Sequence, residues 1–96
     1  MDVRAAWRIA VVGSPGAGKS TLAVHLAAVT GLPLIHLDRE HWRPGRLEPS
    51  PAEWAAAKAA IVARDRWVID GDYGAGLDAR AARADLVVFI DLPRAV

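Results

Sequence analysis

Short apolar runs alternate along the chain with segments in which apolar residues recur at helical spacing. The apolar runs stop at glycine or aspartate, as strands buried on both faces of a sheet do. We expect four such strands, at residues 9–12, 34–38, 67–70 and 86–91. Helical spacing predicts three helices, at residues 19–29, 51–64 and 77–83.

The two longer predicted helices carry recognisable end signals. Gly31 supplies the turn that ends the first helix, and Pro33 prevents its continuation. Ser50 and Glu53 have the spacing of a capping box, with Pro51 between them at the first helical position. The spacing predicts that Leu22, Leu26 and Val29 face inward from the first helix, and Trp54, Ala57 and Ile61 from the second.

This alternation predicts a three-layer α/β fold with a parallel sheet and right-handed crossovers. The 96 residues form at most one domain. In parallel sheets of this kind, ligands bind outside the carboxyl ends of the strands. Candidate site residues are therefore sought just after each strand.

Composition narrows the classes of function. The net charge is +1 with acids and bases mixed along the chain, which does not favour nucleic acid as a partner. Cysteine is absent, and no apolar run approaches the roughly 18 residues of a membrane span. Arg8 interrupts the apolar start where a signal peptide would need its hydrophobic region. These features predict a cytoplasmic protein that has no contact with membranes.

Residues 13–20 match the phosphate-binding P-loop pattern G-x-x-x-x-G-K-[ST] between a predicted strand and a predicted helix. Glycines allow several backbone N–H groups to converge on phosphate oxygens, and the helix directs its positive end at the same group. The motif predicts that Lys19 binds the β- and γ-phosphates of ATP, Ser20 binds Mg²⁺ and Thr21 contacts the α-phosphate. The cofactor-binding residues are Gly13, Ser14, Pro15, Gly16, Ala17, Gly18, Lys19, Ser20 and Thr21.

Three aspartates follow predicted strands. Asp70 is the candidate metal ligand, because a P-loop site needs a carboxylate near Ser20; the alternative is a turn cap. Asp38 is a candidate for orienting a substrate hydroxyl or acting as its general base, and a cap is the alternative. Asp91 fits a helix cap before Pro93.

Arg80 and Arg83 lie on the short helix at 77–83. Either could hold a substrate phosphate or carboxylate, and a solvated helix face is the alternative. His36 is interpreted as a packed or half-exposed histidine rather than a catalytic one. Trp42 is interpreted as a packing residue, with a stacking role on substrate left open.

Taken together, these motifs resemble a bacterial family known as DNA topology modulation proteins, which is similar to adenylate kinase. The resemblance implies a P-loop kinase sheet in the strand order 2-3-1-4-5, with ATP and Mg²⁺ at the P-loop. It also implies Asp70 as the acidic partner of the metal, and Asp38 with Arg80 or Arg83 on the acceptor side. The motifs that carry it are residues 13–21, 36–38, 42–45, 69–73, 83–85 and 89–94.

Members of that family are longer than this chain. Residues 1–96 resemble the N-terminal half of the domain, so we expect four strands in the order 2-3-1-4, with the fifth strand and the arginine-bearing lid missing. The outer edge of residues 86–90 should then be unpaired, which favours self-association. Phosphoryl transfer by this half alone is not expected. The residues expected to be unusually exposed are among Val87, Val88, Phe89 and Ile90.

Two functions remain open at this point. The first is a small kinase that transfers the γ-phosphate of ATP to a nucleotide or another small acceptor, with Lys19, Asp38 and Asp70 as catalytic residues. The second is a nucleotide-binding regulatory protein or nonspecific ATPase that has no phosphate acceptor. A GTPase is disfavoured, because the D-x-x-G motif is absent: the residue three after Asp70 is Tyr73. The acceptor-side residues favour the kinase.

Overall fold

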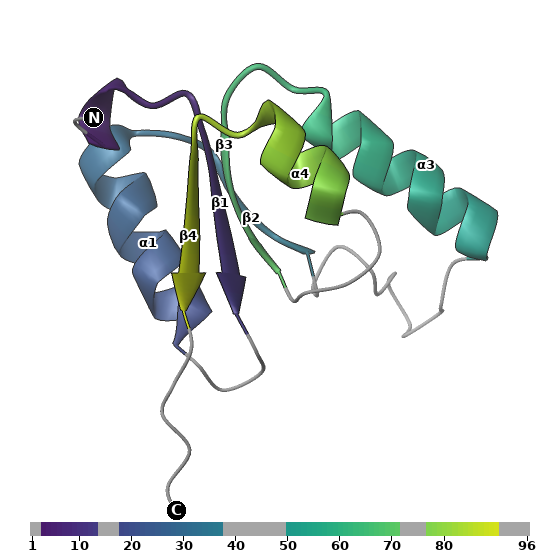
Figure 1. Ribbon diagram of the computed structural model, residues 1–96, viewed down its shortest axis with the longest axis horizontal. Coiled ribbons are helices and arrows are strands. Elements are labelled where there is room, and N and C mark those ends of the chain that lie inside the picture. Colours follow the sequence, from purple (N-terminus) through teal and green to yellow (C-terminus); the bar gives the residue numbers. More distant parts are fainter. Residues whose placement is uncertain (1–2, 14–17, 38–49, 72–76, 91–96) are drawn as a thin grey trace, which may run out of the picture.

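The computed structural model describes residues 3–13, 18–37, 50–71 and 77–90 (Figure 1). Every element predicted from the sequence is present, with ends that differ by at most two residues. β2 ends at His36, because Leu37 already has helical conformation. The elements are the 3₁₀ helix η1 (Val3–Ala5), β1 (Arg8–Gly13), α1 (Lys19–Thr30), β2 (Leu34–His36), α3 (Pro51–Val62), β3 (Trp67–Gly71), α4 (Leu77–Arg83) and β4 (Leu86–Ile90).

The four strands form a parallel sheet in the order β2-β3-β1-β4, as expected. β1 is central and pairs with β3 on one side and β4 on the other. Because all strands run in the same direction, their carboxyl ends meet at one edge of the sheet (Figure 1). This edge, called the carboxyl edge below, is where the sequence predicts the site.

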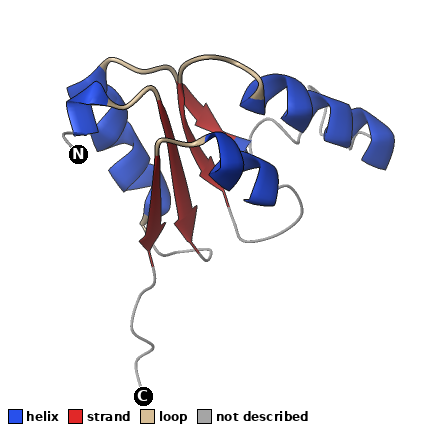
Figure 2. Ribbon diagram, turned by 45° about the horizontal axis from the view of Figure 1, so that its top comes forward, coloured by secondary structure: helices blue, strands red, loops and turns tan. Residues whose placement is uncertain are grey.

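Helices cover both faces of the sheet. Figure 2 shows α1 on one side of the strands, and α3 and α4 on the other. Successive residues of a strand point to opposite faces. Ile9, Val11 and Val68 therefore belong to the core on the α1 side, whereas Ala10 and Ile69 belong to the core on the α3 and α4 side. The same alternation directs Asp70 toward the α1 layer and its neighbour Gly71 toward α4.

The end signals of both longer helices are confirmed. Gly18 precedes α1 with φ 83°, and Gly31 follows it with φ 74°, a left-handed conformation that glycine adopts readily. Before α3, the Ser50 hydroxyl accepts a hydrogen bond from the Glu53 backbone N–H at 3.1 Å. The Glu53 carboxylate accepts one in return from the Ser50 N–H at 3.2 Å, which completes the capping box.

The predicted inward faces of the helices need correction at Val29 and Ala57, which are both exposed. In α1 the buried stripe is centred on Ala23, so Val29 lies to one side of it. In α3 the stripe passes through Trp54 and turns toward Val62, away from Ala57.

Two further predictions concern the surface. Among the described strands, β4 pairs with β1 alone, and its Phe89 side chain is 60% exposed. The expectation of an unusually exposed apolar residue on this strand is therefore confirmed at Phe89. No helix in the described ranges has the length and apolar character needed to cross a membrane.

Asp85 connects the start of β4 to the start of β1. Its Oδ2 accepts hydrogen bonds from the backbone N–H groups of Trp7, at 2.7 Å, and Arg8, at 3.1 Å. The Arg8 guanidinium lies 3.6 Å from Oδ1 of the same carboxylate. These contacts, the Trp7 bond foremost, hold the pKa of Asp85 below its usual value of 3.8.

We expect the Asp85 contacts to make stability depend on pH in the acid range. A carboxyl with a depressed folded-state pKa stabilises the fold above its unfolded pKa of 3.8 and loses that contribution as pH falls through the folded value. Urea unfolding of Asp85→Asn at about pH 6 and about pH 3 should therefore show a smaller acid loss than the wild type. Asp65→Asn, which removes an exposed carboxylate nearby, is the control. Equal acid losses in wild type and Asp85→Asn would contradict the role of Asp85.

Candidate functional site

The junction between β1 and α1 lies at the carboxyl edge. β1 ends at Gly13 and α1 begins at Lys19, close to the ends of β1 and β4 (Figure 1). The residue before α1 is Gly18, which has no side chain to cap the first turn and which turns the backbone into the helix. Lys19 is 7% exposed, whereas Ser20 and Thr21 are exposed. The helix therefore presents an N-terminus with a buried lysine and two hydroxyl groups.

Asp70 lies on the neighbouring strand at the same edge. It is only 2% exposed and, by the alternation along β3, it is directed toward the α1 layer. Its Oδ2 atom is hydrogen-bonded to Nδ1 of His36, the residue that faces it in the register of β2 with β3. The turn that Asp70 could cap lies beyond Gly71, outside the described residues, so the turn-cap alternative stays open.

The donor set at this edge suits one class of metal. In the described part of the chain, no group of three or more histidine, cysteine, aspartate or glutamate side chains is close enough to hold an ion. Magnesium in nucleotide sites needs no such cage, because one or two protein oxygens, the phosphates and water complete its shell. Asp70 and the Ser20 hydroxyl are oxygen donors of that kind, so they fit Mg²⁺ carried by a nucleotide.

Arg80 approaches the carboxyl edge from the opposite face. Its side chain is buried, and its Nη1 atom packs against the backbone at Gly71. A Cβ atom on Gly71 would lie 2.4 Å from this Nη1 and 3.0 Å from a methyl group of Leu37. Glycine directly after Asp70 thus leaves room for the guanidinium of Arg80.

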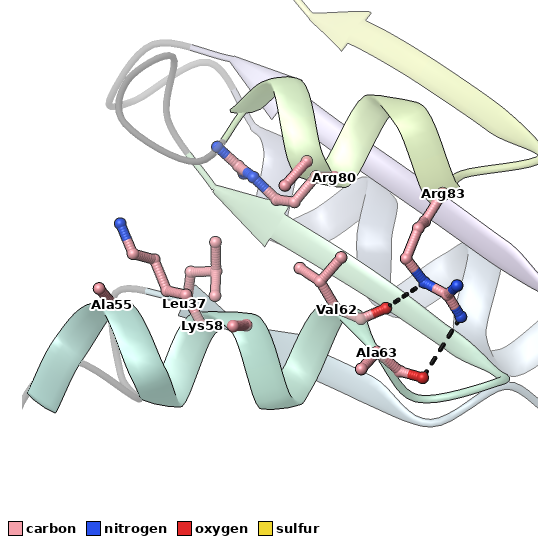
Figure 3. Close-up of a pocket in the computed structure, with 9 residues that line it drawn as sticks. Leu37, Ala55, Lys58, Val62, Ala63, Arg80 and Arg83 are labelled. Carbon is pink, nitrogen blue, oxygen red and sulfur yellow. Dashed lines mark hydrogen bonds between the residues drawn. The ribbon is translucent and has the colours of Figure 1, made fainter.

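Arg83, one turn along α4, has a different role. Its Nε donates to the Val62 carbonyl at 2.7 Å and its Nη2 donates to the Ala63 carbonyl at 3.3 Å (Figure 3). The same Nη2 lies 3.3 Å from the Arg64 carbonyl. These carbonyls belong to the end of α3, where helical partners are lacking. Arg83 therefore caps α3 and ties it to α4.

A pocket of about 490 Å³ lies between α3 and α4 (Figure 3). Its wall is mostly apolar, and Leu37 at the end of β2 contributes to it. Lysine and arginine supply the charged part of the described lining, which suits a ligand with an apolar body and a negative group. The lining residues are Leu37, Ala55, Lys58, Ala59, Val62, Ala63, Ala79, Arg80 and Arg83.

Several residues named from the sequence lie outside the described residues: 14–17 of the P-loop, Asp38, Trp42 and Asp91. Predictions about them stay predictions. The structure brings Asp70 together with a residue that the sequence reasoning had assigned to packing, His36. A signal for this contact was present, because both residues lie near the carboxyl ends of apolar strands that were expected to be neighbours.

Comparisons of the chain with protein-family models, with curated proteins and with solved structures found no significant match. The resemblance to DNA topology modulation proteins therefore stays a prediction, and the function is argued from the geometry of the carboxyl edge.

Proposed function

We propose that this chain binds ATP with Mg²⁺ at residues 13–21 and belongs to a small kinase that transfers the γ-phosphate to a small acceptor. The observation that carries the proposal is the junction of β1 and α1, with Lys19 buried at the helix start and Asp70 directed to the same layer from β3. This arrangement supports the P-loop kinase fold that the resemblance implies. It matches the parts that bind phosphate and metal in P-loop proteins.

The nucleotide side follows from the start of α1. The first N–H groups of a helix have no helical partners, and the helix dipole adds partial positive charge, so an anion is stabilised there. Burial of Lys19 removes part of its hydration, which strengthens its attraction to a polyphosphate. Both effects favour ATP phosphates over an uncharged ligand.

The metal side uses Asp70 and Ser20. Bound Mg²⁺ would neutralise charge on the β- and γ-phosphates and keep them in one orientation. Asp70 would hold the ion or one of its water molecules, and the hydroxyl of Ser20 would supply a second oxygen from the helix start. The carboxylate is already ordered by its bond to His36.

The acceptor side uses the pocket between α3 and α4. Of the two candidate arginines, Arg80 is the better placed for an acceptor, because it lines the pocket and reaches the backbone at Gly71 on the carboxyl edge. Leu37 lines the pocket. The proposed base, Asp38, follows Leu37 in the sequence and lies outside the described residues. This pocket favours a kinase over a nucleotide-binding regulatory protein, which would need no second site.

Transfer of label from γ-labelled ATP tests the kinase assignment directly. The protein is incubated with nucleoside monophosphates and, separately, with other small phosphorylated or hydroxyl-bearing compounds. Labelled acceptor supports the proposal and contradicts the expectation that residues 1–96 alone transfer no phosphate. Release of inorganic phosphate with every acceptor unlabelled would instead support an ATPase.

The metal assignment makes a separate prediction. If Asp70 and Ser20 share Mg²⁺, a chelator should weaken ATP binding to the wild type by roughly tenfold or more, about 1.4 kcal/mol per factor of ten. A chelator should weaken ATP binding to Asp70→Asn much less, because this variant already lacks the carboxylate that is proposed to bind the metal. Titration of fluorescent ATP with Mg²⁺ or with chelator measures both, and Asp65→Asn is the matched control. A mutant that loses as much affinity as the wild type would return Asp70 to a structural role.

A further inference from the structure

The last residue of β2 stands beside the carboxylate proposed to bind metal. We propose that His36 is a positioning residue: its Nδ1–H holds Oδ2 of Asp70 and thereby sets the plane in which this carboxylate meets the metal. The inference rests on the proposed function, because it assumes that Asp70 serves a nucleotide-bound Mg²⁺. It gives a specific role to a histidine that strand position alone had assigned to packing.

The sheet itself brings the two side chains together. In the parallel pairing of β2 with β3, His36 is the register partner of Asp70. Ile35 and Ile69, one residue earlier on each strand, both belong to the core on the α3 and α4 side. By alternation, His36 and Asp70 share the opposite face, toward α1 and its exposed Ser20.

Burial strengthens the hydrogen bond between His36 and Asp70. The side chain of His36 is 14% exposed and that of Asp70 is 3% exposed, so little water reaches the bond. An ionised carboxylate only accepts hydrogen bonds, so the hydrogen between the two groups is on Nδ1 of the imidazole. A charged acceptor in a poorly hydrated site makes such a bond stronger than one at the surface.

The bond acts on a torsion that is intrinsically soft. The carboxylate group of aspartate rotates easily about its terminal carbon–carbon bond, because that sp³–sp² torsion has a broad profile. A hydrogen bond to Oδ2 restricts this rotation and fixes where Oδ1 lies relative to the start of α1. Metal ligands held in this way by a second residue bind their ion more tightly, typically by 10–100-fold.

A purely structural role makes a different prediction. If the pair only stabilised the sheet, its loss would weaken nucleotide binding equally with and without metal. A positioning role affects only the metal-dependent part. The readout must therefore be metal affinity itself, measured beside nucleotide affinity in the absence of metal.

The experiment measures Mn²⁺ binding by electron paramagnetic resonance in the presence of a nonhydrolysable ATP analogue. His36→Leu should weaken Mn²⁺ binding by about 10–100-fold. His36→Asn should restore most of the affinity, because its amide nitrogen occupies the same δ position as Nδ1. Affinity for the analogue in the presence of chelator should be the same in all three proteins. His25→Leu, which replaces an exposed histidine on α1, is the matched control.

Each outcome bears on a different proposal. Unchanged Mn²⁺ affinity in His36→Leu, or equal losses in His36→Leu and His36→Asn, would overturn the positioning role while leaving the proposed function intact. A wild type that binds the analogue but no Mn²⁺ would overturn the metal assignment and this inference with it, and failure to bind the analogue would overturn the proposed function. If His36→Leu does not fold, His36→Gln replaces it, because its amide nitrogen lies one bond too far out to make the same contact.

Discussion

Replacing Lys19 by alanine should weaken ATP binding by about 2–5 kcal/mol, the usual cost of truncating one partner of a desolvated charge pair. Lys19 is only 7% exposed at the start of α1, so water could not replace the contact that we propose it makes with the phosphates. The loss should be large for ATP, smaller for ADP and close to zero for adenosine, since the lysine is proposed to bind the β- and γ-phosphates. This dependence on phosphate number separates a specific contact from general damage to the helix.

Isothermal titration of wild type and Lys19→Ala with ATP, ADP and adenosine measures this series. Arg66→Ala is the control, because it removes one positive charge from an exposed position next to the amino end of β3. Its ATP affinity should match that of the wild type. Equal ATP affinity in wild type and Lys19→Ala would refute the P-loop assignment.

The second large effect concerns the outer edge of β4, through which we expect two copies of the chain to associate. In the described part of the chain this edge has no strand beside it, and residues 86–90 are all apolar. An apolar strand with unpaired backbone groups is a template for a further strand. Phe89, 60% exposed, would add a buried aromatic contact to the backbone pairing.

Sedimentation velocity over a concentration series tests the association. One strand pair buries a small area, so a dissociation constant on the order of micromolar is expected for the wild type. Phe89→Lys should shift the protein to monomer, because charge on an edge strand opposes pairing. Val24→Lys, at a 50% exposed valine on α1, should leave association unchanged. A wild type that stays monomeric at every concentration would contradict association through this edge.

Much of the fold could be predicted from the sequence, for local reasons. A strand buried on both faces needs a continuous apolar run, and helix ends need residues such as Gly31 and Ser50. Both features can therefore be recognised within a few neighbouring residues of the sequence. The order of the strands in a sheet cannot be recognised from any short segment in this way. The order came from the family resemblance, and the structure confirms it for four strands.

The candidate site was harder to predict, because its contacts join distant segments. Helical spacing could not separate Arg80 from Arg83, which lie one turn apart; the difference comes from the end of α3, whose carbonyls engage Arg83. The role of His36 depended on the register between β2 and β3, which a one-residue shift would have changed. The close approach of Arg80 to Gly71 could not be predicted either, because it depends on how α4 packs.

The central position of β1 has a consequence for how the chain folds. Its first residue is bonded to a partner far along the sequence: the hydrogen bond from the Arg8 N–H to the Asp85 carboxylate spans 77 positions. A ribosome adds about 5–20 residues per second, so the apolar strand leaves it seconds before β4 exists. Contacts of such long range also slow folding after release. The nascent chain is therefore most open to aggregation and to chaperone binding at its first strand, which lies between two other strands in the finished sheet.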